Sequence, residues 1–389
     1  MTLSPHLARI VEAEYPRFSE QEMTRRRAAM EELLTQSGCD HLVFCGANRI
    51  GSAVQWLTQW PVTAEAVGVL TPRERDALFV QYINHAPQAS ILADKADVVW
   101  GGESSIAAAI QTLKRRGARA DRIATLGAMT ADQHAALSAK FGKLKSLNRD
   151  YLSLRQVKSV EEIDWLRIGA HFSDLAMSAL RDGARPGLNE RELGDLVERS
   201  YIRYGAVNVI HYFGVTSMQA PDLGVPRQFP RMRQVQSGDI VVAEITAAFW
   251  DHPGQVLRSF ALGEPTKLYR DLHAAADAAF DAITSVLKAG ATPRQVIEAS
   301  TVIEDAGFTI IDDLLHGYGG GYLPPILGTK SRPAGRVPDD PFRAGQTVVI
   351  QPNVVTHDGK AGVQTGEMVL ITETGIERMH SLARGFLTI

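Results

Sequence analysis

The second half of the chain carries a weak internal repeat, and this feature constrains the fold most. The segment "ALRDGARPGLNERELGDLVERSYIRYGA" resembles the later segment "VLKAGATPRQVIEASTVIEDAGF". Each copy has the end of a helix, a glycine, a proline-containing turn and a second helix, and then runs into strand material. Asn189 with Glu192 forms a capping box for one second helix, and Thr292 followed by Pro293 starts the other. The repeat predicts a domain with pseudo-twofold symmetry and a pocket where the halves meet.

A hairpin of two apolar strands follows the first copy. The stretch "VVAEITAAFWDHPGQVLRSFALGEPT" begins at Val241, and almost every second position in it is apolar. The polar residues left over are Glu244, His252, Gln255 and Arg258. Their spacing suggests a binding site, with one carboxylate and one amide as its main groups.

The first part of the chain alternates strand-like and helix-like segments. A helical stretch, "EMTRRRAAMEELLTQSG", ends at Gly38 as a C-cap and is followed by the apolar strand "HLVFCGA". Alternation of this kind predicts an α/β layer domain. Ser159 with Glu162 forms a capping box that starts a long helix ending at Gly183. We therefore expect one domain over residues 1–155 and a second over residues 156–389.

Charge and cysteine content exclude several classes of partner. The formal net charge is −3, so the chain has no basic field of the size that nucleic acid requires. Its two cysteines, Cys39 and Cys45, exclude a disulfide framework and make a reduced, cytoplasmic location the expected one. No stretch approaches the ~18 apolar residues of a membrane span. We expect no nucleic-acid or membrane partner, and a homodimer that acts on a small molecule or short peptide.

Four motifs occur in an order that resembles a known family. They are "RQVKSVEEIDWLRIGA", "SGDIVVAEITAAFWDHPGQVLRSFALGEPT", "HGYGGGYLPP" and "AGQTVVIQPNVVTHDGKAGVQTGEMVLITETGIE". Together they resemble the pita-bread family, which includes creatinase, aminopeptidase P, prolidase and methionine aminopeptidase. The resemblance covers residues 156–389, and residues 1–155 are less closely similar to a creatinase-type accessory domain. It implies an α+β protein with a C-terminal pita-bread domain, a pseudo-twofold repeat and an N-terminal α/β domain.

The resemblance also implies where metal ligands would lie. Catalytic members hold two divalent ions with two Asp, one His and two Glu. Carried over by motif, these positions fall on Glu244, Gln255, His316, Gln351 and Gly366. Glutamine is a poor ligand for a divalent ion in competition with water, and Glu367, one place off, should point to the other face of its strand. We expect no metal and no cofactor, with a single weak ion on Glu244 and His316 as the alternative.

The remaining polar cluster suits an amide-, ureido- or guanidino-bearing ligand, because it offers donors and acceptors without a cation. Creatinase serves as an analogy of chemical strategy: we expect His316 or His211 to be the general base and Glu244 its partner. Substrate contacts are expected from Gln255, Gln351, Arg227, Arg258, Tyr318, Glu367 and His252. Each of three of these residues also has a purely structural alternative. Arg227 would lie on a solvated loop, His211 would be a packed strand histidine, and His252 would be an exposed turn residue. Asp312 and Asp313 are expected to be capping or surface groups.

Three functions follow from these residues. The first is a metal-independent hydrolase that acts on a C–N bond of a small amide, ureido, guanidino or peptide-like substrate. The second is a non-catalytic pita-bread protein that binds such a ligand, and the third is a metallo-aminopeptidase of the Xaa-Pro type with atypical ligands. The pita-bread assignment requires the side chains of Glu244, Gln255, His316 and Gln351 to converge on one cavity. We expect Glu244 to accept a hydrogen bond from His316, a glutamine or Arg258, and its pKa to exceed ~4.3.

Overall fold

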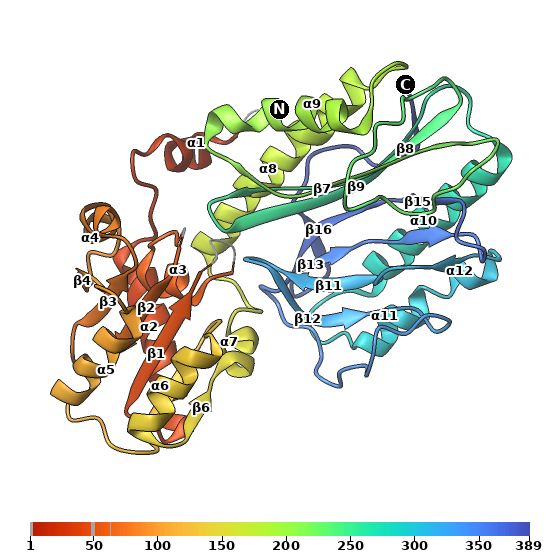
Figure 1. Cartoon of the computed structure of the whole chain (residues 1–389). Coiled ribbons are helices and arrows are strands. Elements are labelled where there is room, and N and C mark those ends of the chain that lie inside the picture. The colour runs from red at the N-terminus through yellow and green to blue at the C-terminus, as the bar shows by residue number, and fades with distance from the viewer. Residues whose placement is uncertain (1–2, 48–50, 63) are drawn as a thin grey trace. The chain divides into compact units, whose positions relative to one another are not determined.

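A computed structural model of the chain describes residues 3–47, 51–62 and 64–389. Two compact units divide the chain (Figure 1). One contains residues 12–155, and the other contains residues 156–389 together with residues 1–11. The sequence analysis assigned residues 1–11 to the first domain, but they group with the second unit. There His6, in helix α1 (Pro5–Glu12), lies 2.9 Å from the carboxylate of Asp164.

The unit of residues 12–155 is an α/β layer, as the alternating pattern predicted. Its six-stranded sheet has the order β4-β3-β2-β1-β5-β6, with parallel and antiparallel pairs. The strands are β1 (His41–Gly46), β2 (Ala66–Leu70), β3 (Asp76–Val80), β4 (Ala96–Trp100), β5 (Ile123–Leu126) and β6 (Leu144–Ser146). The helices are α2 (Glu20–Ser37), α3 (Ala53–Thr58), α4 (Ala86–Leu92), α5 (Ser105–Arg115), α6 (Ala131–Phe141) and α7 (Asn148–Leu154).

Local signals in this unit act as the sequence indicated. Ser19 caps the start of α2 by accepting a hydrogen bond from the backbone N–H of Glu22, and Gly38 ends the helix in the left-handed conformation. Both cysteines, Cys39 and Cys45, are buried free thiols. Burial raises the pKa of the Cys45 thiol to about 12, so this side chain behaves as a core residue and not as a nucleophile.

The second unit is built on a nine-stranded sheet whose main order is β12-β11-β13-β16-β9-β8-β7 (Figure 1). These strands are β7 (Val207–Ser217), β8 (Asp239–Phe249), β9 (His252–Ala261), β11 (Leu315–Tyr318), β12 (Tyr322–Leu327), β13 (Thr347–Ile350) and β16 (Gly366–Ile371). Strands β17 (Ile376–Arg378) and β18 (Leu387–Thr388) pair with β16 and β9. A smaller sheet joins β10 (Thr309–Ile310), β14 (Asn353–Val355) and β15 (Gly362–Gln364). The helices are α8 (Val160–Gly183), α9 (Glu190–Tyr201), α10 (Lys267–Val286), α11 (Pro293–Ala299) and α12 (Val302–Asp305).

The repeated order of helix, helix and strands is present in this unit. Helices α8 and α9 precede the long strands β7, β8 and β9, and helices α10 to α12 precede strands β10 to β13. Capping boxes start α8, α9 and α11 at Ser159, Asn189 and Thr292. The predicted helix starts are therefore confirmed, as is the predicted end of α8 at Gly183. Among the residues that the structure describes, no helix is long and apolar enough to cross a membrane.

Two glycines let helix α8 lie directly on the β8–β9 hairpin. A Cβ added at Gly169 would lie 2.2 Å from the backbone oxygen of His252, and one added at Gly254 would lie 2.2 Å from Cα of Ala170. Neither position therefore accepts a larger residue without a backbone shift. This close packing fixes the back of the hairpin whose other residues form the candidate site.

Candidate active site

The β8–β9 hairpin places Glu244 and Gln255 side by side. In the antiparallel register Gln255 lies opposite Thr246, and Glu244 is two residues from Thr246 on the same strand. Residues that are opposite each other, and residues two apart on one strand, share a face of the sheet. The Nε2 group of Gln255 accordingly donates a hydrogen bond to Oε1 of Glu244 at 2.7 Å. The eleven-residue spacing seen in the sequence is thus the spacing that brings these two side chains together across the turn.

Gln351 and His316 join this pair from the other half of the sheet. Nε2 of Gln255 also lies 3.2 Å from Oε1 of Gln351, which directly follows strand β13. Strand β11, which carries His316, pairs with β13, and Gln351 is close enough to His316 to act on its pKa. The four side chains predicted to converge therefore lie together, and all four residues are buried.

His316 has one ring nitrogen that is engaged and one that is not. Its Nδ1 lies 3.1 Å from the backbone oxygen of Gly317, so Nδ1–H donates there and Nε2 carries the lone pair. Within the described part of the chain, Nε2 is buried without a hydrogen-bond partner. Burial lowers the pKa of His316 to about 4, so the ring is neutral at pH 7. The ring stacks on Tyr322 at 3.8 Å between centroids, and Tyr318 meets it edge-on at 5.3 Å.

Glu244 is a buried carboxyl group, and no basic side chain pairs with it among the residues that the structure describes. Burial, with the negative charge of Asp312 as a second cause, raises its pKa to about 7, while hydrogen bonds from Gln364 and Gln255 act in the opposite direction. The prediction that its pKa exceeds the ordinary value is confirmed, and so is the hydrogen bond from a glutamine. The alternative partners named in the sequence analysis, His316 and Arg258, do not supply that hydrogen bond.

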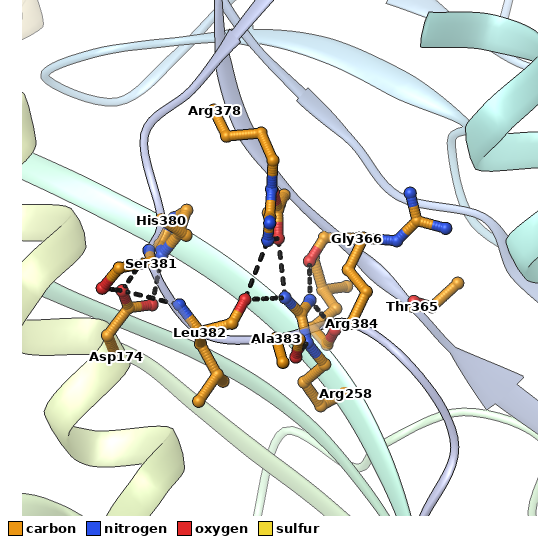
Figure 2. Close-up of polar contacts among 12 residues, drawn as sticks. Asp174, Arg258, Thr365, Gly366, Arg378, His380, Ser381, Leu382, Ala383 and Arg384 are labelled. Carbon is orange, nitrogen blue, oxygen red and sulfur yellow. Dashed lines mark hydrogen bonds and ion pairs between the residues drawn. The ribbon is translucent and has the colours of Figure 1, made fainter.

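Arg258 and Glu367 are occupied by each other and are not available to a substrate. Nη2 of Arg258 lies 2.6 Å from Oε2 of Glu367, and its Nη1 donates to the backbone oxygen of Gly366 at 2.7 Å (Figure 2). Arg378 forms a second ion pair with the same carboxylate. Glu367 lies opposite Val256, two residues from Arg258, so the offset from Gly366 does turn its side chain away from Glu244. The expected substrate-binding roles of Arg258 and Glu367 are therefore wrong for this geometry.

A buried aspartate on helix α8 anchors the chain segment around this ion pair. Asp174 accepts hydrogen bonds at 2.7 Å from the ring of His380 and from the backbone N–H of Ser381 (Figure 2). The carbonyl oxygen of Leu382 then accepts from Arg378 at 2.8 Å. The sequence analysis missed this network because its members are more than 200 residues apart. The available signal was a single carboxylate on the apolar face of a long helix, which requires a buried partner.

His211 lies on the other side of the sheet from Glu244. In the β7–β8 register His211 is opposite Ile245, whereas Tyr212 is opposite Glu244. The ring of His211 lies 3.1 Å from the hydroxyl of Tyr201 in helix α9, and burial lowers its pKa to about 4. The expectation that His211 is the general base is therefore wrong, and the packed strand histidine is the correct alternative.

His252 also lies apart from the cluster, whereas Tyr318 belongs to it. His252 is buried at the hairpin turn, where its Nδ1 lies 2.8 Å from the carboxylate of Asp251. Because His252 is buried, it is not the exposed turn residue that was considered. Strand geometry separates it from Glu244 by roughly five residues or ~17 Å, so it is not a substrate contact at this cluster either. Arg227 is exposed, and its backbone N–H donates to Phe213. Tyr318 is fully buried against His316.

Four residues that the sequence analysis did not assign to the site lie at the cluster. Gln364 acts on Glu244 through a hydrogen bond, and Thr246 lies opposite Gln255. Asp312 and Asp313 were expected to be capping or surface groups, and this holds for Asp312, which is exposed and accepts a hydrogen bond from the backbone N–H of Asp313. Burial, together with a hydrogen bond that the protonated Asp313 carboxyl group donates to Asp312, raises the pKa of Asp313 to about 8. Their position three and four residues before His316 was the signal that could have identified them.

The residues at the site do not fit a pair of divalent metal ions. The matched positions provide one carboxyl group, two amides and one imidazole, and no cluster of three or more His, Cys, Asp or Glu suited to a metal occurs among residues 3–47, 51–62 and 64–389. At Gly366 an added Cβ would lie 2.3 Å from the backbone oxygen of Ile350 and 2.8 Å from Cα of Gln351. A ligating side chain at that position would therefore require the backbone to move.

Comparisons with known proteins identify the fold. An X-Pro aminopeptidase from Thermotoga maritima superimposes with a TM-score of 0.80 and 18% identity, over 93% of this chain and 99% of that one. A prolidase from Pyrococcus furiosus superimposes with a TM-score of 0.76 and 17% identity, over 91% of this chain and 99% of that one. With its curved sheet and repeated helix pairs, the second unit thus has the pita-bread fold.

Sequence relationships identify the family. The model of metallopeptidase family M24 matches residues 164–373, and the chain belongs to this family. An Xaa-Pro dipeptidase from Pyrococcus furiosus is 23% identical over 252 residues, which are 64% of this chain and 69% of that protein. An uncharacterized peptidase from Staphylococcus epidermidis is 24% identical over 243 residues, which span only 65% of its length. The chain therefore spans about two thirds of the length of these relatives, which are described as peptidases.

Proposed function

We propose that this protein hydrolyses a C–N bond of a small amide, ureido, guanidino or peptide-like substrate without a metal ion. The observation that carries the proposal is the buried cluster of Glu244, Gln255, Gln351 and His316, which has one carboxyl group where a dinuclear centre needs several. Family membership supports hydrolysis, and the donor set argues against a metal-bound hydroxide as the nucleophile.

The two titratable groups of the cluster can divide the proton transfers between them. Nε2 of His316 is an unprotonated acceptor at pH 7 and would take a proton from the attacking water as a C–O bond forms. The pKa of Glu244, raised to about 7, leaves part of the population protonated at neutral pH, and this form would donate a proton to the leaving nitrogen as the C–N bond breaks. Return of the proton from His316 to Glu244 through water would restore the starting state.

The glutamines would orient the reacting groups. Nε2 of Gln255 donates to Glu244 and approaches Oε1 of Gln351, so one amide group fixes two neighbours. Nε2 of Gln351 in turn lies 3.2 Å from the backbone oxygen of Asp313. This chain of hydrogen bonds holds the carboxyl group in place when no charged partner does so.

The test combines metal analysis with a hydrolase screen. Protein purified without chelator should hold well under one equivalent of Mn, Co, Fe or Zn. A screen of ureido, guanidino and imidodipeptide compounds should give turnover that resists EDTA and is lost in His316→Asn but retained in the matched surface variant His134→Asn. Two equivalents of bound metal together with EDTA-sensitive cleavage would instead establish metal-dependent hydrolysis.

The second candidate is a metallo-aminopeptidase of the Xaa-Pro type with atypical ligands. It is favoured by the similarity to a relative described as an Xaa-Pro dipeptidase. Without two ions there is no bridging hydroxide and no Lewis acid for the peptide carbonyl, so our proposal expects Xaa-Pro dipeptides to be cleaved very slowly or not at all, even with added Mn²⁺. A non-catalytic binding role is separated from both by Glu244→Gln, which should abolish turnover of any substrate that the screen finds.

A further inference from the structure

We propose that a cavity at the edge of strand β12 binds a small apolar carboxylate, with the hydrocarbon part inside the cavity and the carboxylate on Arg294. The inference goes beyond the proposed function and does not depend on it. None of the residues that line this cavity belongs to the cluster of Glu244, Gln255, Gln351 and His316.

The cavity lies at one end of the nine-stranded sheet. Strand β12 is the last strand in the order of that sheet, and helix α11 lies against it (Figure 1). Both Ile326 and Leu327 line the cavity, although successive residues of a strand point to opposite faces of a sheet. The cavity therefore follows the outer edge of β12, on the side away from its partner strand β11.

Residues 328–337 form one wall of the cavity, and side chains anchor this wall to two helices. Oγ of Ser331 donates a hydrogen bond to Oε1 of Glu304 in α12 at 2.7 Å. Nζ of Lys330 lies 2.6 Å from Oε2 of Glu298 in α11. Because polar contacts hold the wall against both helices, the space between the wall, α11 and β12 is a defined part of the fold.

This space is too large to be a packing defect, and its lining is mainly apolar. Its volume is about 350 Å³, whereas voids larger than a water molecule are few in protein interiors. At about 30 Å³ per water-sized unit, it has room for a ligand of roughly ten non-hydrogen atoms. Ile326 is 43% exposed, so apolar surface of the cavity faces solvent. The apolar lining residues are Ile297, Ile326, Leu327, Pro333, Ala334 and Val337. A concave apolar surface of this size is typical of sites that bury the body of a small molecule.

Among the described residues that line the cavity, Arg294 is the cation without a close partner. Lys330 is neutralised by Glu298, as described above. Nη2 of Arg294 lies 3.8 Å from Oδ1 of Asp339, and the other oxygen of Asp339 lies 3.5 Å from Arg336. One carboxylate is therefore shared between two guanidinium groups, and neither contact is short. The side chains of Arg294 and Asp339 are more than 70% exposed, and ion pairs of this kind contribute little.

The apolar lining and the arginine together define the class of ligand. Burial of a hydrocarbon chain supplies affinity without direction. A guanidinium group at the rim supplies direction, because it binds a carboxylate through two parallel N–H···O bonds. A neutral amide of the same shape keeps only the first contribution, and a carboxylate without a hydrocarbon chain keeps only the second.

The experiment compares octanoate, octanamide and acetate in titrations of the full chain, followed by isothermal titration calorimetry and by thermal shift. We expect octanoate to bind at a single site at least about tenfold more tightly than octanamide, which is a difference of about 1.4 kcal/mol. Acetate should show no detectable binding at the same concentrations. Octanoate should also raise the melting temperature, because it binds the folded state only.

Three variants locate the binding site. Arg294→Gln should bring the affinity for octanoate down to that for octanamide and leave octanamide binding unchanged. Ala334→Phe, whose ring would occupy the cavity, should abolish binding of both probes. Arg191→Gln, which removes an exposed arginine on helix α9, should bind both probes as wild type does. Because Arg294 is exposed, the test of charge remains decisive even if Ala334→Phe does not fold.

Four results would overturn the inference. These are no binding of octanoate, equal affinity of wild type for octanoate and octanamide, an unchanged preference for octanoate in Arg294→Gln, or undiminished binding in a folded Ala334→Phe. The outcome is separable from that of the proposed function. Octanoate binding without any hydrolytic activity would remove the proposed function alone, whereas metal-independent hydrolysis without octanoate binding would remove this inference alone.

Discussion

Replacing Glu244 with glutamine should make the protein more stable at alkaline pH, by an amount set by the cost of ionising a buried carboxyl group. The pKa of Glu244 is raised from 4.5 to about 7, chiefly by burial. Each pKa unit corresponds to about 1.4 kcal/mol, so ionisation of this group costs about 3 kcal/mol of folding free energy. The amide variant keeps the shape and avoids the charge.

The sign of the pH dependence follows from the direction of the pKa change. The folded state binds the proton of Glu244 more tightly than the unfolded state does, because the folded pKa is the higher one. The stabilising contribution of this proton is complete below about pH 4.5, falls as the pH rises and is lost above about pH 7. The pKa of Asp313, raised to about 8, adds a loss of the same sign in both proteins. Because the charge of Glu244 is one cause of that rise, the difference between wild type and variant reports Glu244 together with its repulsion of Asp313.

The measurement is urea unfolding of wild type and Glu244→Gln at several pH values between pH 5 and pH 8.5. The free energy of unfolding of the variant should exceed that of wild type by about 3 kcal/mol at the alkaline end, and the gap should close toward pH 5. Glu373→Gln, at an exposed position, should follow wild type at every pH. Two parallel pH profiles for wild type and Glu244→Gln would refute the reasoning, because they would show that Glu244 ionises as easily in the folded state as in the unfolded state.

Three other variants test the geometry around the site. Arg258→Met should lower the free energy of unfolding by about 3–5 kcal/mol, since it weakens a buried ion pair; a loss below 1 kcal/mol in urea unfolding would contradict this. Gly366→Ala should lower the melting temperature, because its Cβ would lie 2.3 Å from a backbone oxygen, and an unchanged melting temperature would show that the strand yields easily. The triple variant with Asp at Glu244 and Gln255 and Glu at Gln351 should bind Mn²⁺ more tightly than wild type in calorimetry, and no gain would show that the motif alignment is wrong.

Local patterns predicted the elements of the fold because their causes are local. The capping boxes at Ser159 and Asn189 depend on residues three apart, the start at Thr292 was predicted from the proline that follows it, and each starts its helix in the structure. The convergence of Glu244 and Gln255 depends on one hairpin, so the alternation of apolar residues was sufficient to predict it. Both kinds of inference use interactions within about a dozen residues of the chain.

The errors at the site arose where distant segments decide the outcome. Arg258 looked like a substrate contact on its own strand, but Glu367 and the backbone of residues 382–383 occupy its guanidinium group. His211 was assigned from its residue type, and only the register with β8 shows that it faces helix α9. Asp313 was taken for a surface group because the sequence does not reveal that Asn353 and Gln351 hold its backbone.

The contrast between Glu367 and Glu244 shows how one sheet can treat two buried carboxylates differently. Glu367 lies between two arginines, and its pKa is lowered, so it is an ionised structural group at neutral pH. In the described part of the chain the hydrogen-bond partners of Glu244 are amides, and its pKa is raised into the range in which a group can both give and take a proton. Ion pairs hold Glu367 in its ionised form, whereas the protonation state of Glu244 can change when a ligand binds. The amides at Gln255 and Gln351 therefore do more than occupy positions suited to metal ligands. They give Glu244 hydrogen-bond partners without positive charge, so an incoming cation or a leaving nitrogen decides its protonation state.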